Sequence, residues 1–160
     1  MDATWIVSAN ASRARFFSQA NPSGPLQEVN DMVNDEARLR ASESESDRLG
    51  LLAASKSKHN VGAARPASGY EPNQTPDERQ TELFARDVAS FLLHSHQEGG
   101  FQHLSLIASP QFLGVLRKLL DPRLESIVRL EINKDYTQLG AEQLREQIQQ
   151  HKAREWNKSA

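Results

Sequence analysis

Short apolar runs separated by turn residues fill the first part of the chain. Apolar and small side chains occupy positions 5–10, a pattern typical of a strand that is buried on both faces. Residues 13–18 mix cations with aromatics, and residues 26–33 alternate imperfectly between apolar and polar. Because turn residues separate these three segments, the pattern predicts an antiparallel meander of three strands.

Residues 75–152 show a different pattern, in which helical and strand periodicities alternate. Apolar residues at helical spacing predict a long helix that starts at Thr75-Pro76 and stops at Gly99-Gly100. A second predicted helix starts at Ser109-Pro110 and is ended by Asp121-Pro122. The remaining predicted elements are strands at 103–108 and 126–132 and a third amphipathic helix at 141–151.

This order of elements predicts one mixed sheet. Right-handed crossovers from strand to helix to strand favour parallel pairing of the later strands. Joined to the meander, they give an α/β fold with a five-stranded sheet in the order 3-2-1-4-5, whose second strand is antiparallel. With three helices and a long loop after the third strand, this is the connectivity of the ribonuclease H-like three-layer fold. We expect a single domain over residues 1–152, followed by a polar tail over 153–160 that contains Trp156.

A long polar segment follows the third predicted strand. It is rich in Ser and Gly and keeps no hydrophobic period, which predicts a flexible loop over residues 42–75. Its charge is divided, because acids come first and none occurs from residue 48 to residue 70. The basic side chains of that later part are those of Arg48, Lys56, Lys58 and Arg65, with His59 beside them.

Composition narrows the classes of function. The 160 residues carry 19 Lys and Arg against 21 Asp and Glu, so a wholly basic nucleic-acid-binding domain is excluded and any RNA contact must come from a local patch. The absence of cysteine excludes thiol catalysis and thiolate metal sites. Apolar runs are too short to span a bilayer and the N-terminus does not resemble a secretory signal. We therefore expect a cytoplasmic protein with no membrane or DNA partner.

The predicted fold can be tested for nuclease chemistry. Two-metal phosphoryl transfer needs carboxylates that converge from the first strand, the first helix and the end of the fourth strand. The first strand offers Ser8 and Asn10 instead, and the fourth ends in Ala108-Ser109. His94 and His96 are two residues apart and would point to nearly opposite sides of a helix. We therefore expect no catalytic residues, no metal site and no cofactor.

Five short motifs occur in an order that resembles a known family. They are Arg-Ala-Arg-Phe-Phe at 13–17, Glu-Ala-Arg-Leu-Arg at 36–40, Phe-Ala-Arg-Asp at 84–87, Ser-Pro-Gln-Phe-Leu-Gly at 109–114 and Lys-Asp-Tyr-Thr-Gln-Leu at 134–139. The ordered set resembles the bacterial host attachment proteins over about residues 3–152. That family is grouped with bacterial relatives of the archaeo-eukaryotic peptide-chain release factors.

The resemblance implies a fold like the middle domain of the release factors, which is ribonuclease H-like. In that domain a Gly-Gly-Gln loop just before the long helix positions water on the ester of peptidyl-tRNA. The corresponding loop here ends near Pro76 and contains no Gly-Gly-Gln. The nearest match, at 99–102, follows the helix and has an intervening Phe. The resemblance therefore implies a relative without that hydrolytic chemistry.

The lead hypothesis is a non-catalytic protein that associates with the ribosome or its RNA during stress, hibernation or rescue. Its basic loop would enter an RNA-lined site, because a few cations docked on phosphates release counterions. Arginines next to aromatics at 13–17 would add a cation-plus-aromatic patch, and a lysine would contact RNA after the last strand. The expected RNA contacts are Arg13, Arg15, Arg48, Lys56, Lys58, His59, Arg65 and Lys134.

The same residues allow other interpretations. The loop would be a disordered surface segment and the two arginines a solvated strand face. Asp135 and Thr137 would form a local turn by bonding to backbone donors. A protein-interaction or adhesion module would use the sheet edge or exposed helix faces. A degenerate peptidyl-tRNA hydrolase would use Asn60, Asn73 or Gln74. The sequence leaves the oligomeric state open.

Overall fold

The computed structural model describes residues 2–35 and 76–159. The predicted loop over 42–75 therefore lies outside the described residues. Five of the expected RNA contacts fall there, namely Arg48, Lys56, Lys58, His59 and Arg65, together with Asn60, Asn73 and Gln74 of the hydrolase alternative. Those expectations stay predictions.

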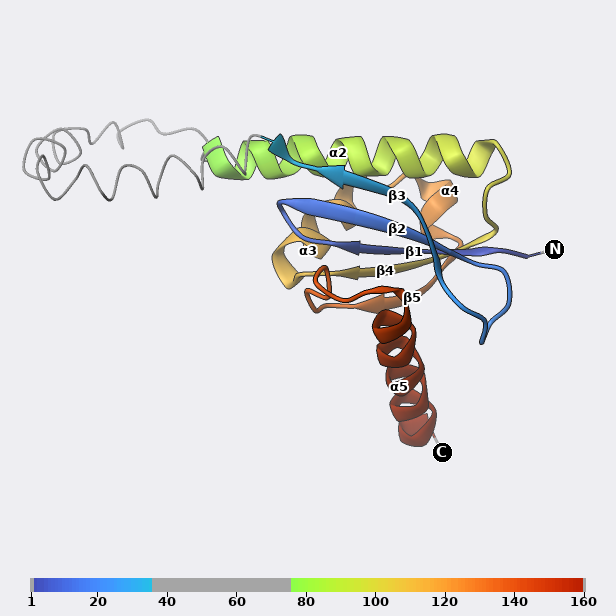
Figure 1. Cartoon of the computed structure of the whole chain (residues 1–160). Helices are drawn as coiled ribbons and strands as arrows, with labels where there is room; N and C mark the ends of the chain where they lie inside the picture. Colours follow the sequence, from blue (N-terminus) through green and yellow to red (C-terminus); the bar gives the residue numbers. More distant parts are fainter. Residues whose placement is uncertain (1, 36–75, 160) are drawn as a thin grey trace, which may run out of the picture.

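Five strands form one open sheet (Figure 1). Their bounds are Thr4–Ala9 for β1, Arg13–Gln19 for β2, Gln27–Val33 for β3, His103–Ala108 for β4 and Val128–Ile132 for β5. The strand order is β3-β2-β1-β4-β5. β2 pairs antiparallel with both β1 and β3, whereas β4 pairs parallel with β1 and β5. The predicted α/β class, strand order and antiparallel second strand are confirmed.

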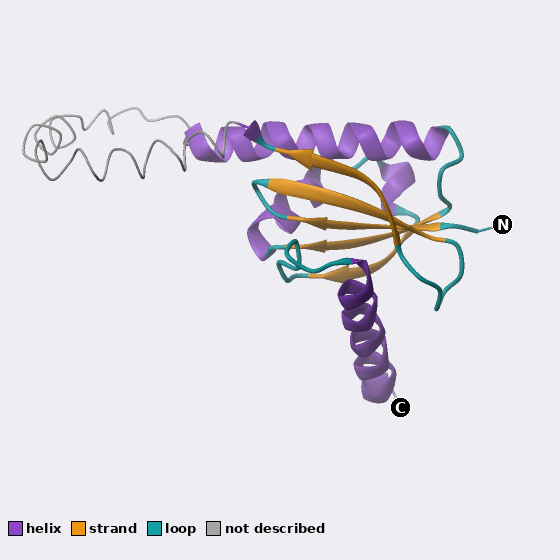
Figure 2. Ribbon diagram, viewed as in Figure 1, coloured by secondary structure: helices purple, strands orange, loops and turns teal. Residues whose placement is uncertain are grey.

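Helices cover both faces of the sheet, which gives the predicted three layers (Figure 2). Their bounds are Pro76–Gln97 for α2, Pro110–Leu119 for α3, Pro122–Glu125 for α4 and Ala141–Ser159 for α5. Residues of α2, α3 and α4 pack on one face, and residues of α5 pack on the other. The short helix α4 differs from the prediction, because Asp121-Pro122 not only follows α3 but also starts a new turn. The Asp121 carboxylate accepts a hydrogen bond from the backbone N–H of Arg123, and Pro122 occupies the first turn.

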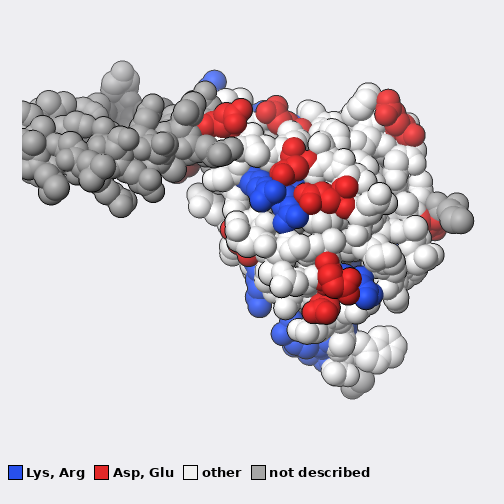
Figure 3. Space-filling view, in the orientation of Figure 1, with Lys and Arg blue, Asp and Glu red and all other residues white. Residues whose placement is uncertain are grey.

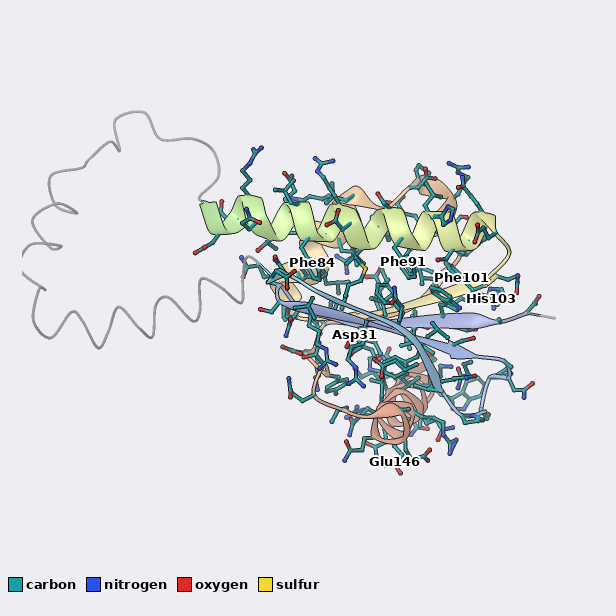
Figure 4. All side chains as sticks on the ribbon, turned by 45° about the horizontal axis from the view of Figure 1, so that its top comes forward. Asp31, Phe84, Phe91, Phe101, His103 and Glu146 are labelled. Atoms are coloured by element: carbon teal, nitrogen blue, oxygen red, sulfur yellow. The ribbon has the colours of Figure 1, made fainter. Side chains whose placement is uncertain are left out.

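The larger core lies between α2 and the sheet and is rich in aromatics. Trp5 of β1 stacks on Phe101 with ring centroids 4.9 Å apart, and Phe16 of β2 meets Phe91 of α2 edge-on at 4.9 Å. Figure 4 shows Phe84, Phe91 and Phe101 between the helix and the sheet. β1 alternates between the two cores and is buried on both faces, as predicted.

The far face of the sheet receives only the first part of α5. Leu144 and Ile148, which were predicted to point inward, are buried against strand residues of the second core. The helix then continues to Ser159, eight residues beyond its predicted end at 151. Residues 153–159 are exposed, as expected of a tail, but they are helical. The reason is that good helix formers follow Ile148 and neither Gly nor Pro interrupts them.

Gly99 ends α2 as predicted, with a φ of +82° that L-residues with a side chain rarely adopt. Gly99→Ala is expected to lower the free energy of unfolding by about 1 kcal/mol. Gly114→Ala inside α3 is the matched control, because a Cβ there meets nothing within 4 Å and alanine favours a helix. Urea denaturation should therefore give opposite signs for the two variants, and equal signs would contradict the assignment of these backbone conformations.

Candidate functional site

The carboxyl edge of the sheet gathers the polar residues that follow β1 and β5, where open α/β sheets tend to bind ligands. The Asn10 side chain donates to Asp135 Oδ2 at 2.9 Å and to Thr137 Oγ1 at 3.2 Å. Its own oxygen accepts from the backbone N–H groups of Ser12 and Arg13. Asn10 therefore both shapes the turn after β1 and fastens it to the connector that follows β5.

Asp135 forms the local turn that was one of the two interpretations for this residue. Its Oδ1 accepts from the backbone N–H of Thr137 at 3.0 Å and from the Thr137 hydroxyl at 2.7 Å. Burial pushes the pKa of Asp135 upward, but hydrogen bonds from Asn10 and Thr137 outweigh that effect and the pKa is lowered. Both carboxylate oxygens accept hydrogen bonds, so this group is suited to anchoring the connector and poorly suited to taking up a proton.

Arg15 is bound on three sides. Its guanidinium pairs with both carboxylate oxygens of Glu28 at 2.9 Å and donates to the backbone carbonyls of Thr137 at 3.0 Å and Leu139 at 2.6 Å. The guanidinium carbon also lies 5.1 Å from the ring centroid of Phe17. Because only 12% of the side chain is exposed, Arg15 joins β2, β3 and the 133–140 connector as an internal tie.

A β-bulge in β3 supplies the carboxylates for both arginines of the Arg-Ala-Arg motif. In a regular strand, residues three apart face opposite sides, yet Glu28 pairs with Arg15 and Asp31 with Arg13. The register shifts by one residue at Val29, so Glu28 and Asp31 reach the same face. Arg13 donates from Nε to Asp31 Oδ1 at 3.0 Å and from Nη2 to Asp31 Oδ2 at 2.7 Å. The Arg-Ala-Arg motif therefore stabilises the fold through ion pairs that could not be predicted from the motif alone.

These pairings correct the expected cation-plus-aromatic patch. Phe16 and Phe17 are both 0% exposed, so neither ring is available to stack on a base. The charges of Arg13 and Arg15 are neutralised by carboxylates, and Figure 3 shows basic and acidic side chains side by side on this face. The aromatic half of the patch is therefore wrong, and RNA contact by either arginine stays a prediction.

Lys134 lies at this edge, as expected from its place after β5. It is exposed and makes no ion pair or hydrogen bond within the described ranges, unlike its neighbour Asp135. A contact between Lys134 and RNA stays a prediction.

The histidines and carboxylates of the described ranges form no group of three that could hold a metal ion. His94 lies 3.2 Å from Glu98, whereas Nδ1 of His96 lies 2.9 Å from the carbonyl oxygen of Phe101. The two rings therefore have separate partners. Within residues 2–35 and 76–159, no helix combines the length and apolarity needed to span a bilayer.

The end of α5 presents functional groups that the sequence reasoning passed over as a tail. Trp156 is 76% exposed, by far the highest value among the large hydrophobic residues of the described part. Lys152 and Arg154 make no ion pair or hydrogen bond there, and Lys158 lies 3.6 Å from Glu155. The signal that could have found them is a tryptophan standing alone among polar and basic residues with helical propensity.

Arg15→Gln is expected to lower the free energy of unfolding by about 2 kcal/mol or more, because Glu28 and two backbone carbonyls lose their donor. Arg86→Gln is the matched control, since Arg86 is 56% exposed and its pair with Glu82 spans 3.8 Å. That change should cost less than about 1 kcal/mol. Equal losses in denaturant unfolding would contradict the role of Arg15 as an internal tie.

Acid should weaken the fold through the same pairs. The hydrogen bond from Arg15 lowers the pKa of Glu28, and that from Arg13 lowers the pKa of Asp31. A lowered folded-state pKa gives stability that is present above the unfolded value and lost as pH falls through the folded value. The free energy of unfolding should therefore decline below about pH 5, and Asp31→Asn should make the decline shallower. Parallel pH profiles for the two proteins would refute this.

Comparison with known proteins places the chain in one family. Residues 5–148 match the model of a family described as protein required for attachment to host cells. No curated protein matches the chain. The match runs from β1 into α5, in agreement with the expected extent, whereas the grouping with release factors stays a prediction. Since the match covers most of the chain, the protein belongs to the family of proteins required for attachment to host cells.

Proposed function

We propose that this protein is a non-catalytic, cytoplasmic binding module. It docks on structured RNA of the ribosome through the end of α5. The observation that carries the proposal is the exposure and the residue composition of this helix end. Every residue from Lys152 to Ser159 is exposed, and the segment combines cations that have no partner within the described residues with the exposed indole of Trp156.

The chemistry of this segment suits single-stranded or looped RNA. Cations that dock on phosphates release counterions, and an exposed aromatic ring gives a base a surface on which to stack. Lys152 and Trp156 are four residues apart, so their side chains lie on the same face of the helix. Arg154 lies on the other side. One RNA strand can therefore meet a charge and a stacking surface together, and Figure 3 shows basic side chains near the end of α5.

Helix chemistry alone explains part of this pattern. Cations near a helix C-terminus interact favourably with its dipole, which accounts for Lys152, Arg154 and Lys158. It does not account for Trp156, because a largely apolar ring gains from contact with a partner and not from water. The tryptophan is therefore the group that favours docking over a purely structural helix end.

The carboxyl edge of the sheet supports a structural role in preference to catalysis. The side chains of Asn10, Arg13, Arg15 and Asp135 are all engaged in hydrogen bonds or ion pairs with one another or with the backbone. A general base needs a free lone pair and a pKa near the working pH, and Asp135 has a lowered pKa. This edge therefore supports a scaffold role within the proposed module.

A second candidate function is attachment through a protein partner, which the description of the family favours. The matching surface is β3, one of the two edge strands of the sheet. Val29 and Val33 on this strand are 44% and 37% exposed, so a partner strand could pair with the edge and cover both side chains.

Co-sedimentation with purified ribosomes at low and high salt tests the RNA proposal. The wild-type protein should pellet at low salt and dissociate as salt rises. Trp156→Ala should weaken binding by about tenfold, because one stacking contact is lost, whereas Trp156→Phe should retain much of it. Arg154→Glu should also weaken binding. Lys118→Glu on α3 is its charge-matched control and should leave binding unchanged, since both cations are exposed and make no ion pair within the described residues.

The RNA proposal fails if the wild-type protein stays in the supernatant at low salt or if Trp156→Ala binds like the wild type. Surface localisation on cells without a ribosome signal would instead favour attachment. In that case Val29→Lys on the edge strand should abolish the contact with the protein partner.

A further inference from the structure

A polar cavity of about 340 Å³ lies at the opposite, amino edge of the sheet, beside the point where α5 leaves it. Its lining includes Thr4, Gln19, His103, Ser105, Arg129 and Lys152. Figure 4 shows His103 at the end of the sheet where β1 begins, and Figure 1 shows α5 running away from this face. The cavity is therefore bounded by three strand ends, the start of β5 and one turn of helix.

The face of the sheet changes from apolar to polar where this cavity begins. Thr4 is in register with both Gln19 and His103, so three polar side chains form a row across β2, β1 and β4. Two residues further in along β1 and β2, the same face carries Ile6 and Phe17 of the second core.

The face of α5 that meets the sheet also changes from apolar to polar at the same place. Ile148 is buried in the second core, and Lys152, one turn later, lines the cavity.

The polar character is not simply that of open surface. Ser105 and Gln19 are each only 6% exposed, although both line the cavity. Nδ1 of His103 is buried and has no hydrogen-bond partner within the described residues. Buried polar atoms are normally hydrogen-bonded, so this nitrogen keeps a hydrogen-bonding capacity that no described residue uses.

The free charges around the cavity are mostly positive. Arg129 and Lys152 make no ion pair or hydrogen bond within the described part of the chain. Arg129 is the extra residue of a bulge in β5, because Leu104 pairs with Val128 while Ser105 pairs with Leu130. Asp2 is the only acid among the described lining residues, and it is 72% exposed and lies 3.5 Å from His103.

We propose that this cavity binds a phosphate monoester, carried by a small nucleotide-sized ligand or by the end of an RNA strand. Arg129 supplies a planar pair of donors that matches phosphate, and Lys152 supplies a second charge. The hydroxyls of Thr4 and Ser105 and the ring of His103 add hydrogen bonds. The volume exceeds what a bare phosphate needs and lies within the range of roughly 300–1,000 Å³ of small-molecule sites.

This inference shares Lys152, and no other residue, with the proposed RNA-docking surface. Trp156 and Arg154 do not line the cavity, and a phosphate site is equally compatible with attachment through a protein partner.

Calorimetric titration of the full chain tests the site with four probes. They are inorganic phosphate, adenosine 5′-monophosphate, and a short RNA oligonucleotide with or without a 5′-phosphate. Arg129→Gln and Lys152→Gln should each weaken binding by about tenfold or more, because each removes a charged donor. Lys118→Gln is the matched control and should leave binding unchanged, since Lys118 is exposed on α3 and lies outside the lining. Lys152 is exposed on a helix, so Lys152→Gln keeps the test valid if Arg129→Gln does not fold.

The outcomes separate the sources of the phosphate. Tighter binding of the free nucleotide than of either oligonucleotide supports a small-molecule ligand, and a dependence of RNA binding on the 5′-phosphate supports a strand end. The inference is overturned if none of the probes binds at millimolar concentration, or if both cavity variants bind like the wild type. Phosphate binding without ribosome sedimentation would uphold this site and refute the proposed function.

Discussion

The limited apolar area on the far face of the sheet determines how α5 is used. Ile6, Phe17 and Ile107 form the part of that face on which Leu144 and Ile148 of the helix pack. Beyond this apolar region the sheet carries polar side chains. The described part of the sheet therefore offers no apolar surface on which the rest of the helix can pack, and the helix continues into solvent. The free helix end and the polar cavity beside it both follow from this one boundary.

The opposite edge of the sheet shows why basic residues in a sequence are weak evidence for an RNA site. Arg13 and Arg15 are each bound by a carboxylate of β3, and Arg15 also holds the connector after β5. These contacts tie distant segments together and offset the charges of both arginines. We therefore place the docking chemistry on α5, where Lys152 and Arg154 have no partner within the described residues.

Periodicity in the sequence was sufficient for the strand order, the antiparallel second strand and the helices on both faces of the sheet, because these depend on local pattern and on the handedness of strand–helix–strand crossovers. It could not predict the bulge at Val29, which decides that Glu28 and Asp31 share a face and is visible only once β2 and β3 are paired. The periodicity also predicted that α5 ends where its apolar residues end, although helical propensity continues after Ile148. The missed helix end and the missed ion pairs concern the very residues on which the candidate sites depend.

Hydrogen exchange of the backbone amides, in the free protein and in its mixture with ribosomes, tests the central claim most directly. In the free protein the amides of residues 152–159 should exchange fast, because every residue of this part of α5 is exposed. The account predicts that ribosomes slow exchange across this segment while the core of α5 around Ile148 stays unchanged. Protection of β3 or of the connector at 133–140, with residues 152–159 unaffected, would contradict it.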